Sequence, residues 1–167
     1  MELLDFFEKW IWLGCAAVGF GILFNVPQRI LAGIFVMAAL GGTLKLLIMH
    51  LGSGIIFASF LGAMSIGFMC VYAAHWRHTP PFVLAIPAVI PMVPGAFAYR
   101  TMLGIIRLTG DLSPDVFMQL LQQTVDNGLK AFFVLLALSL GVSTPMLLTR
   151  SESVKTLKVK LPSILKD

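Results

Sequence analysis

The stretch IPAVIPMVPGAFAYR, residues 86–100, places three prolines and a glycine inside a strongly apolar run. Proline has no N–H to donate, and its ring collides with the carbonyl four residues earlier, so each proline interrupts an α-helix. The residues that follow Gly95 favour a new helix. The stretch therefore predicts two helical pieces, separated by a break, within one apolar segment.

The composition of the rest of the chain is that of a polytopic membrane protein. Of the 167 residues, 58% are hydrophobic and 12% are charged, whereas soluble domains carry about 25% charged residues. The first residues include Glu2, Asp5 and Glu8, unlike the basic start of a cleaved secretory signal. Cys15 and Cys70 both lie in apolar runs, so we expect two buried thiols rather than a disulfide framework.

A membrane-spanning helix needs about 20 predominantly apolar residues. The chain is therefore predicted to be an all-α bundle of about five transmembrane helices, a single domain over residues 1–167, with the fourth span broken. The predicted spans are residues 10–26, 30–50, 55–76, 82–106 and 129–148. Residues 113–128, with Ser113 as the cap and Pro114 at the first helical position, predict an amphipathic helix that lies at the interface or extends the fifth span.

The distribution of basic residues predicts the orientation. Basic residues beside a span favour the cytoplasmic side, so the tail, residues 149–167, is placed in the cytoplasm. With five crossings the N-terminus lies outside, and the links that carry Arg29 and Arg77 lie inside. The net charge of +4 is explained by this orientation signal, and no nucleic-acid partner is expected. The basic residues of the tail are Arg150, Lys155, Lys158, Lys160 and Lys166.

Small residues recur at a spacing of four within the predicted spans. Such pairs allow helix backbones to approach closely in lipid, where small side chains favour association. The spacing therefore predicts tight helix packing. The pairs are Ala17 with Gly21, Ala38 with Gly42, Ala58 with Gly62, and Ala63 with Gly67.

The prolines of the broken segment leave backbone carbonyls without their usual helical partners. Pro87, Pro91 and Pro94 release the carbonyls of the residues four positions earlier, the last of them Ile90. Irregular backbone at membrane depth is tolerated only against protein or a water-filled cavity. The segment is therefore predicted to face away from lipid. The alternative is a proline kink that only shapes the bundle.

The helix that starts after the break is a candidate anion site. A helix start inside the membrane presents unpaired N–H groups and a positive dipole end, which suit a carboxylate. Arg100 could hold a carboxylate through two parallel hydrogen bonds, or its side chain could extend to the headgroups. The candidate substrate-binding residues are Pro91, Pro94, Gly95, Tyr99 and Arg100.

The remaining charged residues have ordinary explanations. Lys45 lies near the end of the second span and is expected to reach the headgroups. Asp126 and Lys130 can pair along one helix face, and Asp126 is also a candidate for coupling transport to proton movement. His75 and His78 lack the further ligands that zinc requires. No metal, cofactor or enzymatic motif is predicted.

The early motif GFGILFNVPQRIL and the late motif AIPAVIPMVPGAFAYRTM together resemble the threonine/serine exporter family, and most of all the small membrane subunit of its split bacterial members. The resemblance covers residues 14–148 or thereabouts. Arg100 is not a position expected to be shared. The positions that match the motifs are Asn25, Pro27, Arg29, Pro87, Pro91, Pro94, Gly95 and Tyr99.

The resemblance implies secondary export of small carboxylate metabolites, such as threonine, serine or succinate, across a bacterial inner membrane. It also implies a larger membrane partner from the same family and coupling to an ion gradient. Five spans would then form one half of an inverted-repeat transporter. Two other functions remain open: a homo-oligomeric, channel-like pore without a partner, and an accessory subunit that only stabilises the partner.

Overall fold

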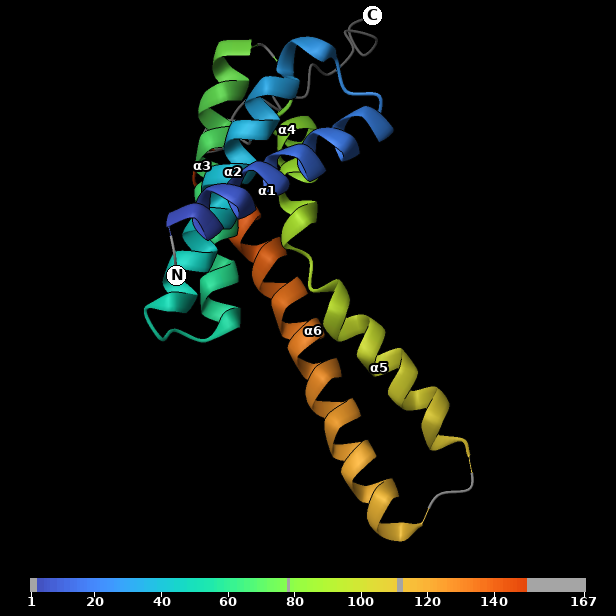
Figure 1. The fold of residues 1–167 in the computed structure, drawn as a ribbon. Coiled ribbons are helices and arrows are strands. Elements are labelled where there is room, and N and C mark those ends of the chain that lie inside the picture. The colour runs from blue at the N-terminus through green and yellow to red at the C-terminus, as the bar shows by residue number, and fades with distance from the viewer. Residues whose placement is uncertain (1–2, 78, 111–112, 150–167) are drawn as a thin grey trace, which may run out of the picture.

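The computed structural model describes residues 3–77, 79–110 and 113–149, and its regular structure in these ranges is helical (Figure 1). This confirms the all-α prediction. The predicted cytoplasmic tail lies, from residue 150 onward, outside the described residues. The elements are α1 (Leu3–Leu23), α2 (Gln28–His50), α3 (Ile55–Arg77), α4 (Pro81–Val89), the 3₁₀ turn η1 (Ile90–Met92), α5 (Gly95–Leu108) and α6 (Pro114–Leu148).

The core lies between α2, α3, α4 and the C-terminal half of α6. Helices α2 and α3 are antiparallel neighbours, joined by a short turn in which Gly52 adopts a φ of 88°. That left-handed conformation is accessible to glycine because it has no Cβ. The largest side chains that are completely buried are apolar ones from these helices, among them Ile34, Ile66, Leu84 and Val134.

Glycines bring the helix backbones of the bundle into contact. A Cβ atom on Gly67 of α3 would lie 2.8 Å from the carbonyl oxygen of Val142 in α6. In the opposite direction, a Cβ on Gly141 would lie 2.6 Å from the carbonyl oxygen of Phe60. The small-residue pairs predicted from the sequence therefore mark real helix contacts. Their four glycines are all buried: Gly21, Gly42, Gly62 and Gly67.

Among the described residues, three helices are long and apolar enough to cross a membrane: α2, residues 55–76 of α3, and α6. Helix α4 with η1 forms a fourth candidate together with α5, and the two parts are bent by 57°. The prediction of a broken fourth span is thus confirmed. The predicted first span, residues 10–26, is not among the candidates found in the described residues, and its crossing of the membrane stays a prediction.

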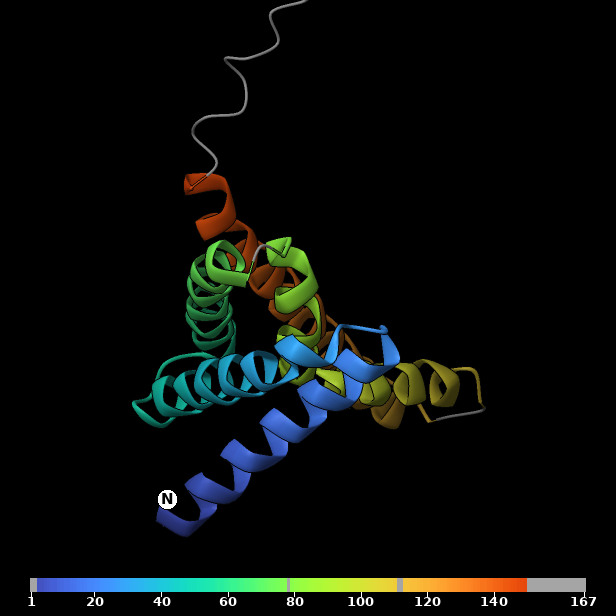
Figure 2. The same cartoon turned by 90° about the horizontal axis from the view of Figure 1, so that it is seen from above.

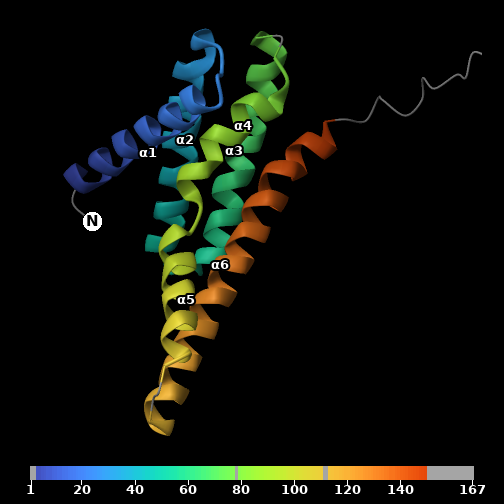
Figure 3. The same ribbon diagram turned by 90° about the vertical axis from the view of Figure 1, so that its right-hand side faces the viewer.

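Helix α1 is strongly apolar after its first turns. It ends at Leu23, and Glu8 and Lys9 lie close to its start. Helix α1 crosses α2 obliquely (Figure 3), and from above its first turns extend away from the other helices (Figure 2).

Helix α6 is a single helix of 35 residues, which is about 52 Å at 1.5 Å per residue. This exceeds the roughly 30 Å of a bilayer's hydrocarbon core. Its N-terminal half and α5 form a hairpin that projects beyond the turn between α2 and α3 (Figures 1 and 3). Residues 113–128 therefore extend the fifth predicted span, with Ser113 as the N-cap and Pro114 first in the helix.

The cysteines are both free thiols. Cys70 is buried, and its sulfur lies 3.5 Å from the sulfur of Met37. Cys15 is exposed on α1, so the expectation of two buried thiols is wrong for this residue. The reason is the oblique path of α1, which leaves one of its faces outside the bundle (Figure 3).

Candidate binding site at the helix break

The break between α4 and α5 is packed against protein on one side only. Pro87, Met92 and Pro94 are buried, whereas Val93 is exposed. The backbone becomes extended at Val93, with φ −61° and ψ 134°, before α5 begins at Gly95. The three prolines thus place irregular backbone against the bundle, as membrane burial requires.

The carbonyls at the break find partners outside the usual helical pattern. The carbonyl oxygen of Ile90 accepts a hydrogen bond of 3.0 Å from the N–H of Val93. Pro94 therefore removes the usual helical partner of the Ile90 carbonyl, as predicted, and the 3₁₀ turn supplies a donor one residue earlier instead. The carbonyl of Met92 is the one that reaches across to another helix.

That carbonyl accepts a hydrogen bond of 3.0 Å from Nζ of Lys45, a half-buried residue of α2. The ammonium group points inward to the break, so the expectation that Lys45 extends to the headgroups is wrong. Gly62 makes room for this contact, because a Cβ there would lie 2.7 Å from Cε of Met92 and 3.1 Å from Cβ of Lys45. Sequence reasoning missed Lys45 as a site residue because its partner is 47 positions away.

The first N–H groups of α5 are mostly satisfied. The Gly95 N–H donates to the carbonyl two residues earlier at 2.9 Å, and those of Phe97 and Ala98 both donate to the Pro94 carbonyl at 3.2 Å. Of these first four groups, the N–H of Ala96 alone has no partner within the described part of the chain. The start of α5 therefore offers one backbone donor rather than a full set.

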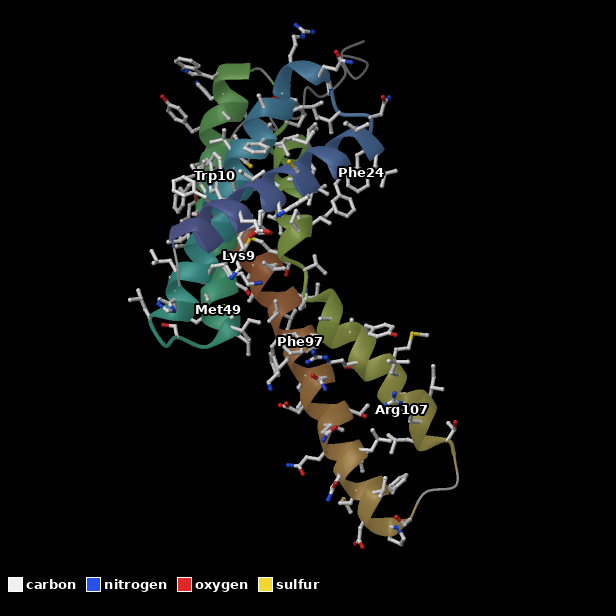
Figure 4. The ribbon with its side chains drawn as sticks, viewed as in Figure 1. Lys9, Trp10, Phe24, Met49, Phe97 and Arg107 are labelled. Atoms are coloured by element: carbon white, nitrogen blue, oxygen red, sulfur yellow. The ribbon has the colours of Figure 1, made fainter. Side chains whose placement is uncertain are left out.

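An open cavity of about 360 Å³ lies beside the break. Its walls come from three elements, and Pro91 and Leu46 are the immediate sequence neighbours of Met92 and Lys45. Lys9 adds a second basic residue from α1 (Figure 4). The lining residues are Lys9, Trp12, Leu13, Ala16, Leu46 and Pro91.

The predicted substrate-binding residues are divided between two places. Pro91, Pro94 and Gly95 lie at the break, and a Cβ on Gly95 would have nothing within 4 Å, so this end of α5 opens onto free space. Tyr99 is 65% exposed on α5. Arg100 is exposed and lines a separate crevice between α5 and α6.

The other predicted residues are placed as follows. Asp126 accepts an ion pair of 2.6 Å from Lys130 on the same helix, with the two side chains 58% and 43% exposed. This is the surface pairing that their spacing indicated, and a coupling role for Asp126 stays a prediction. Asn25, with a φ of 55°, and Pro27 form the turn before α2, and Arg29 is exposed in its first turn. That turn is at the opposite end of α2 from Lys45.

These features define a class of protein: a polytopic helical membrane protein with one bent span that a lysine from a neighbouring helix contacts at the bend. Residues 9–148 match the threonine/serine exporter family, ThrE, and the chain belongs to that family. The resemblance seen in its two motifs is thereby confirmed.

An uncharacterised protein of Haemophilus influenzae (strain ATCC 51907 / DSM 11121 / KW20 / Rd) is 33% identical over 132 residues. The match covers 79% of this chain but 43% of the relative, so the chain spans less than half the length of that curated protein. No solved structure matches the chain.

Proposed function

We propose that this protein is the membrane subunit of a two-component secondary exporter of small carboxylate metabolites, with threonine, serine and succinate as the candidate substrates. Its membership of the threonine/serine exporter family supports export across a membrane. The observation that carries the binding site is the hydrogen bond from Lys45 to the Met92 carbonyl at the break.

A charged side chain inside a span is costly, and in transport proteins such residues mark substrate or ion pathways. The ammonium of Lys45 has three N–H donors, and the structure gives it one described acceptor. In this proposal, a carboxylate bound at the break takes a second donor of Lys45 and the N–H of Ala96, which has no partner in the described part of the chain. Pro91 and Pro94 hold the backbone in the shape that exposes this amide.

A larger membrane partner is part of the proposal. The matched relative is more than twice as long as the matched region, which is consistent with a second portion that a separate chain supplies here. Helix α5 packs chiefly on α6 and exposes an apolar face of its own. Tyr99, Met102, Ile105 and Ile106 form that face, and they offer a surface for such a partner.

We place the protein in a bacterial inner membrane with its C-terminal end in the cytoplasm. Helix α2 begins and α6 ends at the same end of the bundle (Figure 3), so this orientation has Arg29 on the cytoplasmic side as well. The first turns of α1 lie toward the opposite end, where α2 and α3 are joined (Figure 3). This supports an N-terminus on the outer side.

The test is transport of labelled threonine, serine and succinate by proteoliposomes under an imposed proton gradient, with this chain, its partner, or both. The proposal expects transport only when both are present. It also expects at least a tenfold loss with Lys45→Met and little change with Lys130→Gln. Full transport by the partner alone would identify an accessory subunit. Flux through this chain alone, together with a symmetric ring on purification, would identify a pore.

A further inference from the structure

A second polar crevice lies between α5 and α6, away from the break. It has a volume of about 140 Å³, and its polar walls are Arg100 and Arg107 of α5 with Gln123 and Asn127 of α6. A neighbouring hollow of about 350 Å³ shares Arg107 and Gln123 and adds Gln119. Figure 4 shows Phe97 toward the break end of α5 and Arg107 toward its far end.

The polar residues form two facing stripes because of their helical spacing. Arg100 and Arg107 are seven residues apart, close to two turns, so they lie on one face of α5. Gln119, Gln123 and Asn127 follow one another at intervals of four and lie on one face of α6. Both stripes line the crevice, so it is a continuous feature of the hairpin.

Close backbone packing fixes the width of the crevice. Gly104, midway between the two arginines, is buried, and a Cβ there would overlap the hydroxyl of Thr124. That hydroxyl donates a hydrogen bond of 2.7 Å to the Leu120 carbonyl. A Cβ on Gly128 would lie 3.3 Å from Cγ2 of Thr101. The crevice is therefore formed before any ligand arrives.

The charge of the crevice is one-sided. Within the described part of the hairpin, neither arginine has a carboxylate partner, and Asp126 is already paired with Lys130. The residues that line the two hollows include no acid. Guanidinium groups present a rigid fork of donors that matches an oxyanion, and amide N–H₂ groups can add further donors.

We propose that the Arg100–Arg107 crevice is an oxyanion subsite that receives the carboxylate of the exported substrate after it leaves the break. Its role in transport rests on the proposed function, whereas anion binding can be tested without it. Helix α5 starts at the break and carries Arg100 first and Arg107 two turns later. The hairpin also projects from the end of the bundle opposite to the end of α6 (Figure 3).

The test is a calorimetric titration of the full chain, in nanodiscs of phosphatidylcholine, with succinate and with its neutral diamide. We expect saturable binding of succinate that is about tenfold weaker in Arg107→Gln and in Arg100→Gln. Arg107→Lys should bind succinate more tightly than Arg107→Gln and less tightly than the unmodified protein, because lysine keeps the positive charge but lacks the paired N–H donors of the guanidinium group. Arg29→Gln, at the other end of the bundle, is the matched control and should bind as the unmodified protein does.

Three results would overturn the proposal: no saturable succinate binding, equal binding of the diamide, or unchanged affinity in both glutamine variants. A lipid phosphate is the other source of an oxyanion. If the arginines serve headgroups, Arg107→Gln will reduce retention of phosphatidylglycerol in mixed-lipid nanodiscs and leave succinate affinity unchanged. Lys45→Met separates the two proposals, since it removes the break site while the crevice should still bind succinate.

Discussion

At the scale of single residues, Lys45 changes the interpretation of the prolines. The sequence indicates that backbone carbonyls near residue 90 lose their usual helical hydrogen bonds, but it does not show which side chain donates to them instead. In the structure the donor is a lysine of α2, and the receiving carbonyl belongs to Met92 at the last position of η1. A positive charge thus lies where the bent span meets the bundle.

Replacement of Lys45 by methionine should loosen the break. The Met92 carbonyl would lose its charged donor, and hydrogen bonds to charged groups contribute about 1.5–3 kcal/mol. We expect faster amide hydrogen exchange in a peptide covering residues 86–100, measured by mass spectrometry on the protein in nanodiscs. Lys130→Met, which removes an exposed lysine of α6, is the control. Identical exchange in all three proteins would contradict the assignment.

The two arginines show what residue spacing can and cannot reveal. Arg100 was identifiable from the sequence as a residue that could hold a carboxylate, but its expected place was the break. The structure puts it in the crevice with Arg107, because α5 turns by 57° away from α4. Local spacing fixes which residues share a face, whereas the direction of that face depends on the bend.

At the scale of elements, the contact between α3 and α6 is the tightest structural constraint. At Gly67 and at Gly141 the backbone of the other helix lies so close that the Cβ atom of any larger residue would collide with it. In lipid there is little hydrophobic drive for helix association, so close van der Waals packing takes its place. The orientation of the α5–α6 hairpin therefore depends on two glycines in the bundle.

Gly141→Ala should separate α3 from α6. The added methyl group would lie 2.6 Å from the Phe60 carbonyl oxygen, which is backbone and cannot rotate away. Overpacking of this kind costs about 1–3 kcal/mol. We expect a lower midpoint temperature of aggregation in detergent, measured by size-exclusion chromatography of heated samples. Gly19→Ala, where a Cβ meets nothing within 4 Å, should leave the midpoint unchanged. Equal midpoints for both variants would disprove the contact.

The helices differ in how well the sequence predicts them. The bounds of α2 and α3 follow from apolar length, and the break follows from proline chemistry. Helix α1 is the exception, because an apolar run predicts burial in lipid or protein without specifying the direction of the helix. The sequence also does not predict that α6 is one continuous helix. A polar N-terminal half is compatible with either a separate surface helix or an extension of the span.

At the scale of the whole molecule, the arrangement of helix ends makes a topology that can be checked. The turn between α2 and α3 lies at one end of the bundle (Figure 1), and the start of α2 and the end of α6 lie at the other (Figure 3). Both faces of the membrane therefore carry described loop positions that a probe can reach.

Single cysteines should report this arrangement in intact cells. In a background with Cys15 and Cys70 replaced, Ser53→Cys should react with a membrane-impermeant maleimide added outside. Gln28→Cys and Thr149→Cys should react only after the cells are opened, because the proposed orientation puts this end of the bundle in the cytoplasm. Labelling of Ser53→Cys and Thr149→Cys from the same side would show that the bundle does not cross the membrane as described.

The unbroken course of α6 has a mechanical consequence. The C-terminal half of this helix packs on α3, and its N-terminal half packs on α5. A rotation of α6 about its contact with α3 would therefore move α5 as well. A slight pivot at that contact is amplified at the free end of the hairpin. Such a pivot would be absorbed at the proline-rich bend, where the backbone leaves the helical conformation at Val93. Any motion that widens the cavity beside Lys45 would therefore also sweep Arg100 and Arg107 through an arc.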